Sequence, residues 1–110
     1  MTPDLGIIEG YFGRSWDWPT RTAVMRRLAA VGYGFFHYAP KSDTHLRRDW
    51  KAPHPAAQAA ELAAFSRACN DAGVRFGIGL SPYELYLDFN GAARTALAEK
   101  LAFFDAIGVR

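Results

Sequence analysis

Residues 32–41 read GYGFFHYAPK, and this stretch decides the fold. Gly32 ends a preceding segment of helical period, because glycine readily takes the left-handed conformation that closes a last helical turn. The aromatic-rich residues 33–38 are typical of a short buried strand. Pro40 stops that strand, since proline cannot donate to a ladder hydrogen bond. Lys41 follows directly, so the stretch combines a helix end, a strand and a polar strand end.

The same order recurs on both sides of this stretch. Further strands are expected at residues 5–10 and 74–80, Gly73 and Gly108 end two more helical segments, and Asp17 is expected to cap the first helix. Amphipathic stripes support the three helices: Val24, Leu28 and Val31; Leu62, Phe65, Cys69 and Ala72; and Leu97, Leu101 and Phe104. Strands that alternate with helices imply parallel pairing. The fold class is therefore α/β, either a doubly wound sheet or a (β/α)-barrel.

Composition bounds the size of the domain. The chain has 110 residues, of which 50% are hydrophobic and 22% charged, as in an ordinary globular domain. A complete eight-unit barrel needs about 250 residues. Val109 and Arg110 resemble the start of a fourth strand, so we expect residues 1–110 to form an incomplete domain.

Several functional classes are disfavoured by the same composition. The net charge of +2 comes from scattered residues, which argues against a nucleic-acid surface. One cysteine, Cys69, permits no intrachain disulfide, and His37, His45 and His54 lack metal-ligand spacing, so no metal is expected. No signal peptide and no apolar stretch of about 20 residues is visible, so we expect no membrane association and a cytoplasmic location.

Chemistry in parallel α/β folds gathers at the carboxyl ends of the strands. Gly10 would let backbone approach a ligand closely there, or would simply form a tight turn under aromatic side chains. Lys41 is suited to donate to sugar hydroxyls, or would pair with Asp43 as an ordinary surface lysine. The residues alone leave both alternatives open.

Two further side chains invite functional interpretations. Glu9 could act as a general acid, but Glu9 and Gly10 point to opposite faces of a regular strand and no second carboxylate is evident, so a structural role is expected. Trp50 would serve as a stacking platform for a sugar, or would pack on the following helix.

Three segments carry a family resemblance, and they occur in this order: GIIEGYFGRSW at 6–16, YAPKSD at 38–43 and LSP at 80–82. Together they resemble glycoside hydrolase family 84, the O-GlcNAcase and hyaluronidase-type β-N-acetylglucosaminidases. The resemblance implies the first three βα units of a (β/α)8 TIM barrel, truncated at the start of the fourth strand. Residues 1–110 would then be the N-terminal portion of the catalytic barrel.

The resemblance also implies a function for the parent protein. The family removes N-acetylglucosamine from glycans or glycoproteins with retention, using the substrate's 2-acetamido oxygen as nucleophile and no metal or organic cofactor. Its two adjacent catalytic aspartates follow the fourth strand, so this chain would contain no catalytic residue. Carried over by position, the Gly10 carbonyl and the Lys41 ammonium would bind the sugar.

Departures from the family pattern leave the pocket shape and the aglycone open; they are Tyr11-Phe12 for Phe-Tyr, Ser15 for proline and Ser42 for an acid. One alternative is an inactive carbohydrate-binding fragment or pseudoenzyme, and another is an unrelated α/β domain. Taken alone, the chain is expected to self-associate through unpaired strand edges.

Overall fold

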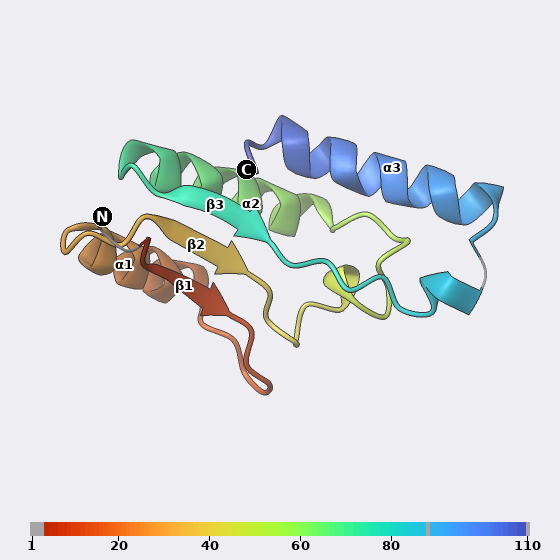
Figure 1. The fold of residues 1–110 in the computed structure, drawn as a ribbon, viewed down its shortest axis with the longest axis horizontal. Helices are drawn as coiled ribbons and strands as arrows, with labels where there is room; N and C mark the ends of the chain where they lie inside the picture. The colour runs from red at the N-terminus through yellow and green to blue at the C-terminus, as the bar shows by residue number, and fades with distance from the viewer. Residues whose placement is uncertain (1–3, 88, 110) are drawn as a thin grey trace.

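A parallel sheet forms the centre of the molecule (Figure 1), whose computed structural model describes residues 4–87 and 89–109. Its strands lie side by side in the order β1-β2-β3 and run in one direction. They are β1 (Gly6–Glu9), β2 (Phe35–Tyr38) and β3 (Arg75–Ile78). The predicted α/β class and all three strands are confirmed, although each strand is shorter than its predicted range.

Helices connect and follow the strands. They are α1 (Trp18–Ala29), α2 (Ala56–Asp71) and α3 (Gly91–Ala106), with short 3₁₀ turns η1 (Thr44–Leu46) and η2 (Leu85–Leu87). The predicted cap of α1 is confirmed, because the Asp17 carboxylate accepts from the Thr20 backbone N–H at 2.8 Å. Hydrogen bonding from the Thr20 side chain and then from its backbone N–H lowers the pKa of Asp17 below its ordinary value.

The predicted glycine stops are confirmed at all three helices. Gly32, Gly73 and Gly108 have φ values of 98°, 74° and 91°. After α2, the Gly73 N–H donates to the Asn70 carbonyl at 3.1 Å and the Val74 N–H donates to the Cys69 carbonyl at 2.8 Å. This pair of bonds satisfies carbonyls that the helix end would otherwise leave unpaired.

The core lies between the sheet and the helices, and α1 and α2 cover one face of the sheet (Figure 1). Its buried side chains are Met25, Phe36, Tyr38, Leu46, Leu62, Phe65, Cys69, Val74, Phe76 and Phe104. The predicted stripe of α2 is confirmed at Leu62, Phe65 and Cys69, but Ala72 is exposed because α2 ends at Asp71. In the part of the chain that the structure describes, no helix covers the opposite face of the sheet, and Ile8 on that face is 67% exposed.

The other two stripes were partly wrong. Val31 is 69% exposed because it lies beyond the last residue of α1, which buries Arg21 and Met25 instead. Leu101 is 52% exposed because α3 turns Lys100 and Phe104 inward. Within the part of the chain that the structure describes, no helix combines the length and apolar character needed to cross a membrane.

Candidate functional site

The carboxyl ends of β1 and β2 are joined beyond the strands themselves. The Ala39 N–H donates to the Glu9 carbonyl at 2.9 Å, and the Lys41 N–H donates to the Tyr11 carbonyl at 3.4 Å. Gly10 lies between these two acceptors. The structure therefore brings Gly10 and Lys41 to neighbouring positions on one edge of the sheet.

The conformation of Gly10 bears on why glycine stands there. Its φ is not positive, whereas Gly13 in the following turn has a φ of 92°. A Cβ added at Gly10 would meet Ile8 Cγ2 at 3.7 Å and the Ala39 carbonyl oxygen at 3.8 Å, which are ordinary contacts. Gly13 is thus the residue that needs glycine for a turn, and neither turn geometry nor packing within the chain requires glycine at position 10.

Lys41 is half-buried and its ammonium lies over an aromatic ring. Its Nζ is 5.8 Å from the centroid of the exposed Phe12 ring, and Arg47 Cζ lies at 5.8 Å from the same centroid. Arg47 Nη1 also donates to the Lys41 carbonyl at 3.4 Å. Among the described residues, the basic side chains within 4.0 Å of the Asp43 carboxylate are His45 and His54, so the alternative that Lys41 pairs with Asp43 is wrong.

Asp43 is a buried acceptor two residues after Lys41, a role that sequence reasoning missed. Its carboxylate accepts from Tyr38 Oη at 2.7 Å, Gln58 Nε2 at 2.8 Å, the His45 backbone N–H at 3.0 Å and His54 Nε2 at 3.1 Å. Burial raises the pKa of Asp43, but the bonds from His54 and Tyr38 outweigh burial and hold the pKa below its ordinary value. The carboxylate is therefore ionised at neutral pH.

The structure also assembles a cluster that histidine spacing did not predict. Ligand-type atoms of Asp43, His45 and His54 lie within 4.8 Å of one another. Both Asp43 oxygens, however, already accept hydrogen bonds from the protein. Nearby, the buried Lys100 ammonium donates to the carbonyls of His45 at 3.0 Å and Ala52 at 2.7 Å. A second cation would be repelled there, so the geometry favours a hydrogen-bonded hub over a metal site.

Glu9 has the structural role expected for it. Its carboxylate is 1% exposed and accepts from Arg21 Nε at 2.6 Å and Nη2 at 2.8 Å. The Arg21 guanidinium lies between two rings, 4.2 Å from the Trp18 centroid and 4.8 Å from the Tyr38 centroid. Because both oxygens are occupied by a permanent cation, Glu9 is a poor candidate for proton transfer.

Trp50 is not a stacking platform. It is 1% exposed, and its Nε1 donates to the Tyr83 carbonyl at 3.1 Å. The Ser81 N–H donates to the Leu46 carbonyl at 2.7 Å, so the segment after β3 is tied to the loop after β2. Exposed aromatic side chains at this edge are instead Phe12, which is 76% exposed, and Tyr83, which is 54% exposed.

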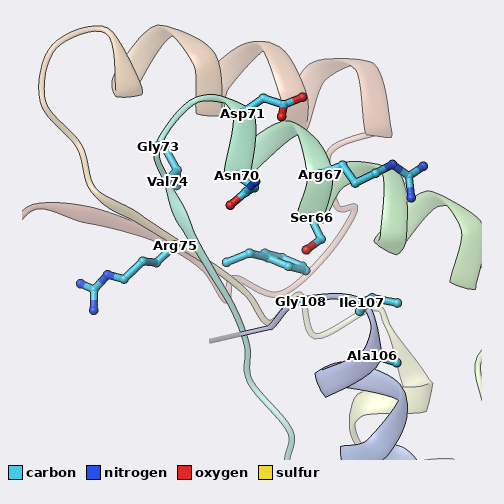
Figure 2. Close-up of a pocket in the computed structure, with 11 residues that line it drawn as sticks. Ser66, Arg67, Asn70, Asp71, Gly73, Val74, Arg75, Ala106, Ile107 and Gly108 are labelled. Carbon is cyan, nitrogen blue, oxygen red and sulfur yellow. The ribbon is translucent and has the colours of Figure 1, made fainter.

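Hollows lie at both ends of the sheet. One, about 790 Å³, is formed by the ends of α2 and α3 and the start of β3, and Figure 2 shows Arg67 and Arg75 extending away from it on opposite sides. At the strand carboxyl ends, one hollow of about 210 Å³ is lined by Lys41, Thr44, Arg47, Arg48 and Tyr83, and another of about 530 Å³ is lined by residues 48–52, Tyr83, Glu84 and Leu87. The candidate site is at the hollow of about 210 Å³, which Lys41 lines and Gly10 does not.

Comparison with known proteins identifies relatives of this chain in sequence and in fold. A family model described as beta-N-acetylglucosaminidase matches residues 5–110. The protein O-GlcNAcases of Rattus norvegicus and Mus musculus are each 30% identical over 77 residues, which is 70% of this chain and 8% of each relative. A solved O-GlcNAc hydrolase mutant of Thermobaculum terrenum superposes with a TM-score of 0.88 at 27% identity, covering 96% of this chain and 23% of that chain.

The matched part of the chain spans less than a tenth of the length of the curated relatives. Nearly all of this chain superposes on the solved hydrolase, but it covers less than a quarter of that hydrolase. The family match covers both strand ends that carry Gly10 and Lys41. The resemblance inferred from the sequence motifs is thereby confirmed, and the chain belongs to the β-N-acetylglucosaminidase family, glycoside hydrolase family 84.

Proposed function

We propose that the protein containing this chain removes terminal N-acetylglucosamine from glycans or glycoproteins, and that this chain supplies part of the sugar pocket. The Gly10 carbonyl accepts from a sugar hydroxyl and the Lys41 ammonium donates to one. The observation that carries the proposal is the pairing of the two strand ends through Glu9 and Tyr11, because it places both groups on one edge. A cytoplasmic location stays a prediction.

The proposed reaction proceeds with retention and is assisted by the substrate. The 2-acetamido oxygen attacks the anomeric carbon and closes an oxazoline ring, while the bond to the aglycone oxygen breaks and one aspartate protonates that oxygen. Water then attacks the anomeric carbon and opens the oxazoline, giving its proton to the same aspartate. The second aspartate orients the acetamido group. No two adjacent aspartates occur in these 110 residues. The chain by itself is therefore expected to bind the sugar without cleaving it.

We further propose that residues 1–110 are the N-terminal portion of the catalytic (β/α)8 barrel, contributing its first three βα units. The uncovered face of the sheet supports this, since the inner strand faces of a barrel carry no helices. On that face, a Cβ at Gly6 would meet the Phe35 ring at 2.2 Å and a Cβ at Gly77 would meet the His37 ring at 2.5 Å. Side chains thus already lie across neighbouring strands, as in a packed interior.

The test uses the full-length protein and a chromogenic β-N-acetylglucosaminide. We expect turnover, and we expect Lys41→Ala to lower kcat/KM by about tenfold or more, because a hydrogen bond from a charged group contributes about 1.5–3 kcal/mol. Lys51→Ala is the matched control, since Lys51 is an exposed lysine of the same loop. Unchanged kinetics for Lys41→Ala would remove Lys41 from the site.

The alternative is a carbohydrate-binding protein without activity. Binding of N-acetylglucosamine by calorimetry, with no release of chromophore by the full-length protein, would favour that alternative. Loss of that binding in Lys41→Ala would still support Lys41 as part of the site.

A further inference from the structure

We propose that Tyr38 is a positioning residue that links the two sugar-binding strand ends through a buried chain from Glu9 to Asp43, an inference that rests on the function proposed for Gly10 and Lys41. Tyr38 is the last residue of β2 and is 3% exposed. It pairs in register with Glu9 of β1. Its side chain therefore lies inside the sheet edge that carries the site.

One side of Tyr38 is connected to Gly10. The Arg21 guanidinium lies 4.8 Å from the Tyr38 ring centroid and holds both Glu9 oxygens, at 2.6 and 2.8 Å. Arg21 Nη2 also donates to the Trp16 carbonyl at 2.8 Å. The loop that carries Gly10 is thus fastened at both of its ends to one buried guanidinium.

The other side of Tyr38 is connected to Lys41. The Tyr38 hydroxyl donates to Asp43 Oδ2 at 2.7 Å, and the Asp43 N–H donates to the Pro40 carbonyl at 3.1 Å. Lys41 lies within this turn, between Pro40 and Asp43. Holding the Asp43 carboxylate therefore fixes the turn from which the Lys41 ammonium extends.

The ring and the hydroxyl of Tyr38 act on different ends and can be separated by substitution. Tyr38→Phe keeps the ring beside Arg21 and removes the donor to Asp43, so it should disturb Lys41 alone. A hydrogen bond to a charged group is strong enough that its loss should raise KM on the order of fivefold. The kcat should change less, because the groups that break the bond lie elsewhere.

The experiment is a double-mutant cycle in the full-length protein with the chromogenic substrate. Wild type, Tyr38→Phe, Lys41→Ala and the double variant are compared, with thermal melts to verify folding. We expect Tyr38→Phe to raise KM in the presence of Lys41 and to have almost no further effect in the Lys41→Ala background. Tyr33→Phe, at the opposite end of the same strand segment, should leave KM unchanged.

The contradicting results separate this inference from the proposed function. An equal effect of Tyr38→Phe on KM in both backgrounds would show a general structural role and overturn the inference. So would an unchanged KM in Tyr38→Phe when Lys41→Ala does impair the kinetics. No effect of Lys41→Ala itself would overturn the proposed site. If Tyr38→Phe fails to fold, Gln58→Ala, which removes another Asp43 donor from the half-buried Gln58, is judged by the same criteria.

Discussion

At the scale of single residues, two glycines on one strand segment stand where they do for different reasons. An added Cβ at Gly6 would meet the Phe35 ring at 2.2 Å, whereas one at Gly10 would have its nearest contact at 3.7 Å. Packing within the chain thus requires glycine at position 6 and leaves position 10 open. The space above Gly10 is available to a ligand.

We expect Gly10→Ala to leave the free energy of unfolding unchanged or to raise it by up to about 1 kcal/mol, since alanine restricts the unfolded chain. The same variant should bind N-acetylglucosamine more weakly. Gly6→Ala is the matched control and should cost about 1–3 kcal/mol, because the Phe35 ring must move. Urea unfolding and calorimetric titration measure the two effects; wild-type affinity in Gly10→Ala would exclude this backbone from the sugar contact.

Asp43 predicts a pH dependence of stability. Its pKa is held below the ordinary value of about 3.9, so its contribution is fully present above that value and is lost as pH falls through the lowered pKa. Asp43→Asn should remove this acid-induced loss and lower the free energy of unfolding at pH 7 by about 1–3 kcal/mol. Urea unfolding at a series of pH values tests this. Asp49→Asn, an exposed change in the same loop, should retain the acid-induced loss.

At the scale of elements, a buried ion pair joins β1 to α1. Glu9 is 1% and Arg21 2% exposed, so removing one partner leaves an unpaired charge in the core. We expect Arg21→Met to cost about 3–5 kcal/mol, and the double variant with Glu9→Leu to be less destabilised than Arg21→Met alone. Arg26→Met, on the exposed side of α1, should change stability by less than about 0.5 kcal/mol. Chemical denaturation of all four proteins gives the comparison.

Elements set by local chemistry were predictable from the sequence, and buried charges were not. Gly73 ends α2 because its own backbone permits the turn, which a reader of the sequence can see. The burial of Arg21 and Lys100 could not be predicted, because their partners are distant along the chain. These partners are the Glu9 carboxylate and carbonyls of the loop after β2. Helical periodicity favoured Val31 and Leu101 instead, since periodicity marks a stripe without giving the helix end or its rotation.

The candidate site likewise has a part that sequence reasoning predicted and a part that it missed. Position at a strand end made Gly10 and Lys41 candidates, the family resemblance assigned them to the sugar, and the structure brings both to one edge. The pairing of Lys41 with Asp43 was wrong, because nearness in sequence does not give side-chain direction where a strand turns. The Asp43 hub was missed because Tyr38, His54 and Gln58 converge on it from three separate segments.

At the scale of the whole molecule, the sheet formed by the described residues has open edges and one open face. β1 and β3 are outer strands, and Ile8 is 67% exposed on the uncovered face. Unpaired edges and exposed apolar surface favour association. The hydrophobic burial available to the 110 residues is also limited by their number.

We therefore expect the isolated 110-residue chain to self-associate, with a sedimentation coefficient that rises with concentration. Ile8→Lys should shift it towards monomer. Val31→Lys removes an equally exposed apolar side chain, 69% exposed, from the end of α1 and should leave association unchanged. A concentration-independent monomer would contradict the role given to the open sheet.

The hydrogen bonds of Lys100 form late during synthesis of the chain. Its ammonium holds the carbonyls of His45 and Ala52, which lie 55 and 48 residues earlier in the chain. At ribosomal rates of about 5–20 residues per second, Lys100 is synthesised roughly 2–11 seconds after the residues that carry those carbonyls. The loop after Lys41 thus acquires its last anchors only when α3 has emerged. A nascent chain lacking α3 should therefore present this end to a ribosome-bound protease, and the ligand would meet a site that matures late in translation.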